Sequence, residues 1–157
     1  MRISHKVDYG VRAALTLAER QRDAPGTSIT GRELAEVDGL PPKFVDDILR
    51  IMRAGGIVRS ARGTGGGWSL ARPAAEITVA DVIRAIDGPL ASVRGVRPHE
   101  LGREEPDALV SLWIAVRAAL RQVLEQVTLA DLASGDLPPE VRRLVDDRDA
   151  WQSRDLR

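Results

Sequence analysis

The sequence predicts a mainly α-helical protein with one small β-hairpin, arranged as a winged helix-turn-helix followed by a long C-terminal helix. Two helical patterns joined by a tight turn occupy about residues 30–54. A glycine-tipped hairpin with arginines at its base follows at residues 57–71. An apolar heptad pattern then runs through residues 109–127 and indicates a long helix with a partner surface.

The composition agrees with this fold class. The chain has 157 residues, enough for one compact domain with an appended element, and 43% of them are apolar. Aromatic residues make up only 3%, so the core must consist of Leu, Val, Ile and Ala, of which Leu and Ala favour helices. The absence of cysteine excludes disulfides, thiolate zinc sites and cysteine-ligated iron–sulfur clusters.

No targeting or membrane segment is visible in the sequence. Residues 1–10 carry polar and charged side chains throughout, unlike a signal peptide. No apolar run approaches the roughly 20 residues of a membrane span. We therefore expect a cytoplasmic protein with no membrane partner.

The first two helices have clear start and stop signals. Apolar residues recur at helical spacing over about residues 4–20, and residues 23–27 read as a turn. Thr30 and Glu33 form a capping-box sequence that starts the second helix. The helix ends at Asp38-Gly39, because glycine adopts the positive φ that a tight turn between helices often needs.

The third helix is the candidate recognition helix. Pro41 and Pro42 suit its first turn, where missing N–H groups do no harm, and Gly55 and Gly56 end it. Its buried stripe follows the i, i+3, i+4, i+7 pattern, at Val45, Ile48, Leu49 and Met52. Its open face carries Lys43, Asp46, Asp47 and Arg50.

The hairpin that follows carries the sequence Arg62-Gly63-Thr64-Gly65-Gly66-Gly67-Trp68 at its tip. Phosphate-binding loops are also glycine-rich, but they open a helix, whereas a strand-like run stopped by Pro73 follows here. Arg59 and Arg62 favour the wing of a winged helix instead. Glycines let a backbone approach DNA closely, and arginine contacts phosphate or enters the minor groove.

The second half begins with another capping box at Thr78 and Asp81, and the helix that it starts closes at residues 88–89. Residues 90–106 show no clear period and are expected to form a loop. A long helix follows from about residue 107 to 127. Its a/d seam consists of Leu109, Trp113, Val116, Leu120, Val123 and Val127.

The seam predicts a homodimer. A helix in a single-chain core can show the same pattern, but the winged-helix core is complete without it. The commonest partner surface is a second copy related by a twofold axis, which also matches the repeated half-sites of helix-turn-helix operators.

We expect four parts along the chain. These are a DNA-binding domain at residues 1–88, a connecting loop at 89–106, a dimerisation helix with a short cap at 107–133, and a charged tail at 134–157. The tail lacks a long apolar stripe and is expected to hold at most a short, frayed helix.

Basic residues gather where the motif lies, although the net charge is zero. Residues 43–72 hold six basic residues against two acidic ones, which indicates binding to double-stranded DNA. The candidate DNA contacts are Arg2 and Lys6 near the amino end, Lys43, Asp46, Asp47 and Arg50 on the third helix, and Arg59, Arg62, Gly63 and Thr64 in the hairpin.

Two interpretations of Asp46 and Asp47 stay open. Carboxylates repel phosphate, yet one of them can accept a hydrogen bond from cytosine N4 and so read a base. Alternatively, both only solvate the open face of the helix.

The sequence offers no catalytic constellation. His5 and His99 are the only histidines, and no nucleophile–base pair can be identified. His99-Glu100 lacks the second histidine of a metalloprotease helix. We expect no enzyme activity and no bound cofactor or metal.

The order of elements resembles the Rrf2 family of bacterial winged-helix regulators over about residues 1–133. The motifs that carry the resemblance are Met1-Arg2-Ile3-Ser4 with Lys6 and Tyr9, Glu33-Leu34-Ala35, residues 53–58, 62–70 and 77–88, and Thr128-Leu129-Ala130-Asp131-Leu132. The resemblance implies a homodimeric, sequence-specific regulator, with repression favoured, that reads a palindromic operator. It implies that helix 41–53 is the recognition helix and that Arg62-Gly63 reads DNA at the wing tip.

The chain also departs from that family. Many members hold an iron–sulfur cluster on three cysteines after the position of residues 87–88, and the first would fall near Gly95, where this chain has none. Asp8 lies where one subfamily supplies a non-cysteine ligand, but one carboxylate alone cannot hold a cluster. The loop at 90–106 either receives a small-molecule effector or serves only as a connector.

One alternative function belongs to a different class. A protein-interaction module could keep the winged-helix fold without binding DNA, and the zero net charge and the Asp46-Asp47 pair support it. A steep fall of affinity with salt would favour DNA, because phosphate contacts release counterions.

Overall fold

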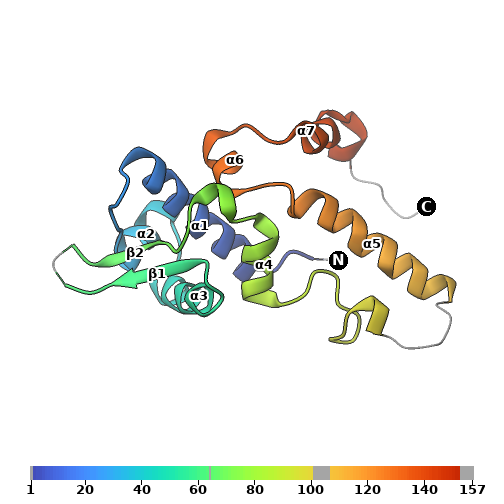
Figure 1. Ribbon diagram of the computed structural model, residues 1–157, viewed down its shortest axis with the longest axis horizontal. Helices are drawn as coiled ribbons and strands as arrows, with labels where there is room; N and C mark the ends of the chain where they lie inside the picture. The colour runs from blue at the N-terminus through green and yellow to red at the C-terminus, as the bar shows by residue number, and fades with distance from the viewer. Residues whose placement is uncertain (1, 64, 101–106, 153–157) are drawn as a thin grey trace.

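The computed structural model describes residues 2–63, 65–100 and 107–152, and it is mostly helical (Figure 1). Its α-helices are α1 (His5–Asp23), α2 (Gly31–Asp38), α3 (Pro42–Ala54), α4 (Val79–Asp87), α5 (Ala108–Leu124), α6 (Leu129–Ser134) and α7 (Pro139–Asp146). Its strands are β1 (Val58–Ala61) and β2 (Gly67–Leu70). Short 3-10 turns are η1 (Ala74–Glu76), η2 (Pro98–Glu100) and η3 (Arg148–Trp151).

The predicted helix boundaries are largely confirmed, because hydrogen bonds local in sequence fix them. In both predicted capping boxes the threonine hydroxyl accepts from the backbone N–H three residues on, and the acid accepts from the threonine N–H. The Thr30 N–H bond to Glu33 is 2.8 Å long. Gly39 adopts φ +63° at the end of α2, as its position predicted. A third capping box joins Thr128 and Asp131 at the start of α6.

The core lies among α1, α3, α4 and α6, with α1 in the centre (Figure 1). The predicted stripe of α3 is fully buried. Helix α1 runs three residues beyond its predicted end and buries Ala13 and Leu17 as well as the expected Val7, Ala14 and Ala18. This burial holds the recognition helix rigidly on the rest of the fold.

The hairpin is antiparallel and is fastened to the chain that precedes α2. Val58 pairs with Leu70, and Ala61 pairs with Gly67. The Trp68 N–H donates to the Ile29 carbonyl at 2.8 Å, and the Ile29 N–H donates back to the Trp68 carbonyl at 3.1 Å. This extra bridge fixes the position of the wing, defined here as residues 58–70, relative to α2 and α3.

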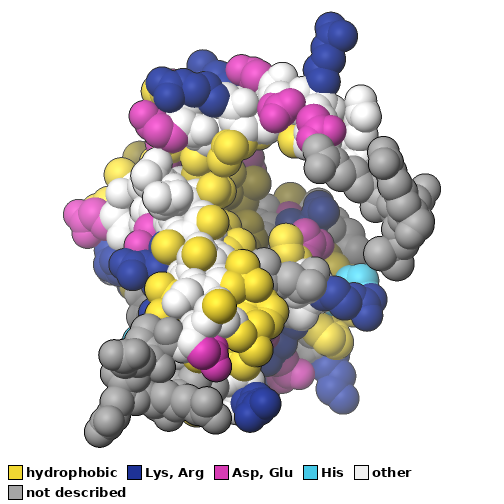
Figure 2. Space-filling model, turned by 90° about the vertical axis from the view of Figure 1, so that its right-hand side faces the viewer, with side chains coloured by type: hydrophobic (Ala, Val, Ile, Leu, Met, Phe, Trp, Pro, Cys, Tyr) yellow, Lys and Arg dark blue, Asp and Glu magenta, His cyan; other side chains and the backbone are white. Residues whose placement is uncertain are grey.

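Helix α5 extends away from the core at the end of the molecule opposite the wing (Figure 1). It packs on α4 and η2, and none of its residues is buried. Figure 2 views the molecule from this end and shows hydrophobic side chains gathered along the helix. Leu109, Leu112 and Ile114 are 57%, 53% and 40% exposed.

The predicted seam follows α5 only in part. The helix ends at Leu124 rather than near Val127, because the Val127 carbonyl accepts from the Val79 N–H at 2.9 Å. Val127 is therefore buried within its own chain. Trp113, Val116, Leu120 and Val123 are half-buried.

The charged tail holds a short helix, α7, as the sequence allowed, and the 3-10 turn η3 follows it. Helix α7 buries Val141 and leaves Leu144 and Val145 exposed. The Trp151 indole N–H donates to the Val145 carbonyl at 2.7 Å, which folds η3 back onto α7. Figure 1 shows α7 lying across from α5.

Candidate DNA-binding surface

The open face of α3 presents the four polar residues predicted for it. Lys43, Asp46, Asp47 and Arg50 are all exposed, because the opposite stripe of α3 is packed in the core. Arg50 and Asp47 form an ion pair one turn apart, at 3.3 Å. An exposed pair of this kind contributes little stability, so Arg50 is free to exchange its partner for a phosphate.

Asp46 has a neighbour that the sequence did not suggest. A Cβ built on Gly31 would lie 2.9 Å from an Asp46 carboxylate oxygen, which places that carboxylate beside the first turn of α2. The positive end of a helix dipole favours a carboxylate there. Asp46 therefore lies at the junction of α2 and α3, and both interpretations that the sequence left open remain compatible with this position.

The wing presents its arginines to solvent. Arg59 and Arg62 are exposed, and Arg59 donates to the Ser69 hydroxyl across the hairpin at 3.1 Å. Gly63 has φ +96°, a conformation that side chains disfavour. Thr64, the last of the predicted wing contacts, lies outside the described residues.

Gly67 is needed for the wing to reach the body of the protein. A Cβ at this position would lie 2.6 Å from the Ile29 carbonyl oxygen, and the residue has φ +155°. The close approach of β2 to the chain before α2 therefore requires glycine.

Arg53 was counted in the basic segment but was not predicted as a site residue. Its guanidinium lies 5.9 Å from the centre of the Trp68 ring and donates to the Ser60 hydroxyl at 3.4 Å. It thereby joins the end of α3 to the wing. Its position three residues after Arg50, on the same helix face, is the signal that could have found it.

The two predicted contacts near the amino end lie apart. Lys6 lines a surface hollow of about 420 Å³ with Phe44, Asp47 and Arg50, next to the recognition helix. Arg2 instead lines a groove of about 560 Å³ on the side of α5. The structure thus brings Lys6, and not Arg2, to the open face of α3.

Aromatic side chains support the start of the recognition helix. Phe44 meets Tyr9 edge to face, with ring centres 5.8 Å apart, and the Tyr9 ring lies 6.1 Å from His5. Phe44 is still 46% exposed. Sequence reasoning missed Phe44, although an apolar side chain on the predicted polar face was a visible signal.

The groove that contains Arg2 lies where the DNA-binding part meets the long helix. The Ser4 hydroxyl donates to the Asp87 carboxylate at 2.9 Å in its wall. Its apolar lining consists of Ile3, Val7, Ile83, Pro89, Leu90, Leu120 and Leu124, among others. The groove is therefore lined by side chains from the amino end of the chain, from α4 and from α5.

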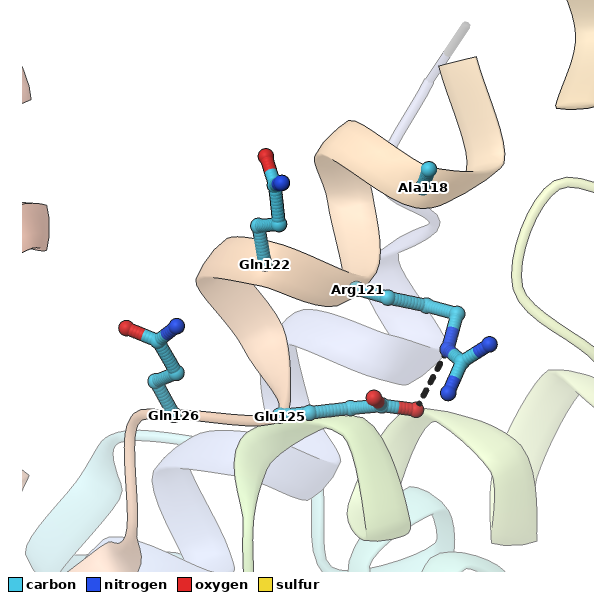
Figure 3. Close-up of a pocket in the computed structure, with 5 residues that line it drawn as sticks. All are labelled: Ala118, Arg121, Gln122, Glu125 and Gln126. Carbon is cyan, nitrogen blue, oxygen red and sulfur yellow. Dashed lines mark hydrogen bonds and ion pairs between the residues drawn. The ribbon is translucent and has the colours of Figure 1, made fainter. Parts of the chain in front are cut away.

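Charge pairs join α5 to the DNA-binding part. Glu125 pairs with Arg121, at 2.9 Å (Figure 3), and it also pairs with Arg84 of α4. The hydrogen bonds from Arg121 and Arg84 lower the pKa of the Glu125 carboxyl below its usual range. Asp8, by contrast, pairs with Arg12 one turn along α1 at 2.9 Å, as a helix-face residue does.

Among the described residues, no helix is long and apolar enough to cross a membrane.

Comparison with known proteins identifies relatives over nearly the whole chain. The family model of Rrf2, described as an iron-dependent transcriptional regulator, matches residues 3–135. An HTH-type transcriptional regulator of Mycobacterium tuberculosis is 49% identical over 154 residues, covering 98% of this chain and 94% of the relative. The HTH-type transcriptional regulator CymR of Bacillus subtilis is 34% identical over 134 residues, covering 85% of this chain and 91% of CymR.

Solved structures show the same fold. The structure of CymR, the global cysteine regulator of B. subtilis, matches with a TM-score of 0.71 at 30% identity, covering 86% of this chain and 98% of that one. IscR of T. potens matches with a TM-score of 0.68 at 27% identity, covering 99% and 94%.

The family description implies iron, which requires a set of side chains that can ligate it. The full sequence has no cysteine, so no thiolate can ligate a cluster. In the described ranges, no group of three or more His, Asp or Glu side chains lies together. The described part of the chain therefore does not fit an iron site, and the cysteine-free sequence does not fit a cysteine-ligated iron–sulfur cluster.

Proposed function

The chain belongs to the Rrf2 family of transcriptional regulators, and from that premise we propose that it binds a palindromic operator as a homodimer and represses transcription without an iron–sulfur cluster. The observation that carries the proposal is the joined surface of α3 and the wing. Arg53 contacts Trp68 across that junction, so the two elements meet a duplex as one unit.

The proposed contacts divide by their chemistry. Lys6, Lys43, Arg59 and Arg62 carry positive charge toward phosphates, with the glycine tip of the wing allowing a close approach. We propose that Arg50 and one of the two aspartates, Asp46 or Asp47, read base edges in the major groove, the carboxylate by accepting from cytosine N4. We propose that Phe44, exposed on the same helix, contacts a thymine methyl group.

The proposed dimer rests on α5. Leu109, Trp113, Val116, Leu120 and Val123 form the interface, together with the exposed Leu112, and a twofold axis sets two recognition helices on successive half-sites. Val127 is left out, because it is buried in its own chain. We propose repression because occupancy of an operator is by itself enough to exclude polymerase.

A fluorescence anisotropy titration against fragments of the source genome tests DNA binding. We expect some fragments to bind at least about a thousandfold more tightly than random duplex at physiological salt, with affinity falling steeply as salt rises. Affinity that is equal for all sequences, or that does not depend on salt, would support the interaction-module alternative instead. Sedimentation of the free protein tests the dimer.

The groove beside α5 is the proposed site for a small-molecule effector. Its apolar lining suits an apolar group, and Arg2 and Asp87 at its wall suit a polar end. A ligand found by thermal-shift screening should change operator affinity, and Ile83→Trp, which fills the groove, should abolish its effect.

A further inference from the structure

A pocket of about 230 Å³ lies between the end of α4 and the middle of α5. The chain that joins α4 to η2 lies beside α5 (Figure 1), and η2 packs on that helix. The wall of the pocket consists of Arg84 from α4, residues 88–90, Arg97 and Arg117 from α5. Three arginines from separate segments therefore line one pocket, and within the described ranges no acidic side chain lines it.

Arg117 lies on the half-buried face of α5 and lacks a carboxylate partner. Its guanidinium donates to Nδ1 of His99 at 3.4 Å, and no other interaction of this side chain occurs in the described part of the chain. Its Nε–H group is buried and has no acceptor there. Buried N–H groups almost always have an acceptor, and a half-buried charge is costly without a counter-charge. Arg117 is therefore suited to bind an anion that this part of the chain does not supply.

Arg84 belongs to a network of ion pairs. It pairs with Glu125, which also pairs with Arg121 at 2.9 Å. It pairs with Asp81 at 3.9 Å, and Asp81 also pairs with Arg72 at 3.6 Å. Three arginines thus share two carboxylates, and three minus two leaves an excess of one positive charge beside the pocket.

The rest of the pocket adds a second positive charge. Arg97 and Glu100 form an ion pair at 3.3 Å, so their charges cancel. Asp87 lies in the wall of the neighbouring groove, where its carboxylate already accepts a hydrogen bond. The excess charge of the Arg84 network and the charge of Arg117 then sum to +2 around the pocket.

We propose that this pocket binds a small dianion of the phosphate type. A charge of −2 matches the excess of +2, and the planar fork of arginine pairs with phosphate oxygens through two parallel hydrogen bonds. The ion pairs of Arg84 and Arg97 leave N–H groups for a ligand, because each guanidinium carries several donors. Pro89 and Leu90 provide an apolar wall for a short organic group attached to the phosphate.

The source of the phosphate group is a small molecule and not a DNA duplex. None of the described DNA contacts lines the pocket, and α5 extends from the end of the molecule opposite the wing. The pocket shares residues 88–90 with the proposed effector groove but has arginines that the groove lacks. A dianion held by Arg84 and Arg117 fastens α4 to α5 within one chain. The inference goes beyond the proposed function and needs neither DNA binding nor a dimer.

Calorimetric titration of the full chain with inorganic phosphate tests the site. The titration is carried out at about pH 8, where a phosphate group is mainly doubly charged, and at an ionic strength held constant with chloride. We expect a single site per chain with a dissociation constant at or below about 1 mM. Succinate, a dianion with planar carboxylates, should bind at least about tenfold more weakly. No saturable binding of phosphate, or equal affinity for succinate, would overturn the proposal.

Arginine variants locate the bound phosphate. Arg117→Met and Arg97→Met each keep an unbranched stem and should weaken phosphate binding at least about tenfold, and the exposed position of Arg97 makes its variant safe for folding. Arg62→Met in the wing and Arg2→Met in the effector groove are the matched controls and should change it less than about twofold. A loss in either control with no loss in Arg117→Met would place the phosphate elsewhere and overturn the inference. Neither result bears on operator binding, which is measured separately.

Discussion

The guanidinium of Arg53 lies 5.9 Å from the centre of the Trp68 ring, so that a side chain from the last turn of α3 rests against the second strand of the wing. This contact couples the two DNA-facing elements of the fold. Because Arg53 is largely exposed, the interaction is expected to contribute about 0.5–1 kcal/mol to the free energy of unfolding.

A double-mutant cycle measures that coupling. Arg53→Met keeps an unbranched apolar stem, and Trp68→Leu keeps a smaller apolar side chain, and both remove the cation–π contact, singly and together. Urea denaturation should give a coupling energy of about 0.5–1 kcal/mol. A value within error of zero would show that the contact between Arg53 and Trp68 does not couple the wing to α3.

Gly67→Ala should displace the wing. The added methyl group meets the Ile29 backbone, which is unable to yield without breaking its two hydrogen bonds to Trp68. We expect operator affinity to fall at least about tenfold in anisotropy titrations, a loss of about 1.4 kcal/mol. Gly135→Ala, at the end of α6 and away from the wing, is the matched control, since its φ is also positive but no atom lies within 4 Å of the added group. Equal losses for both variants would contradict the steric account.

Arg62→Ala should weaken binding and also flatten its dependence on salt. If Arg62 meets one phosphate, the slope of log K against log salt should decrease in magnitude by about 1. If it reads a base, the loss should be about 1–3 kcal/mol and greatest on the cognate sequence. Arg143→Ala, at the other end of the molecule, should leave the titration unchanged, and an unchanged titration for Arg62→Ala would exclude it from the site.

The ion pairs of Glu125 should make stability depend on pH. Arg121 and Arg84 lower the pKa of Glu125 in the folded chain, so its contribution is present above the ordinary glutamate pKa and is lost as pH falls through the lower folded value. Between about pH 6 and pH 3, the free energy of unfolding of the parent protein should therefore fall more than that of Glu125→Gln. If the free energies of unfolding of the two proteins fall in parallel with pH, folding does not stabilise the charged form of the Glu125 carboxylate.

Leu112→Asp should separate the proposed dimer. The side chain is 53% exposed on α5, and burial of a leucine at an interface is expected to contribute about 1.5–3 kcal/mol. Sedimentation should show a dissociation constant raised at least about tenfold. Val37→Asp is the control, because Val37 is 65% exposed on α2, far from the proposed interface in sequence and fold. The same shift in both variants would point to a general effect of added charge.

Much of the site could be predicted because it depends on one helix and one hairpin. The helical spacing of four apolar residues predicted which face of α3 is buried and which is open to solvent. The structure confirms this prediction, because the buried residues of α3 are Val45, Ile48, Leu49 and Met52. Arg53 was missed as a site residue because its partner, Trp68, is distant in sequence and is brought near only by the hairpin. Arg2 and Lys6 are four residues apart at the start of the chain, yet only Lys6 reaches the recognition helix.

By itself the sequence determined the helix starts and stops, the hairpin and the family, because capping boxes, glycine turns and apolar periods act between residues close along the chain. Only the tertiary structure decided that Val127 pairs with Val79 and leaves the seam, that Asp46 lies beside the first turn of α2, and that Leu144, Val145 and Trp151 of the charged tail are exposed. Those outcomes depend on contacts between distant segments. The spacing of apolar residues along a helix does not predict such contacts. The same spacing arises whether the apolar side chains are buried in the core of their own chain or against a partner.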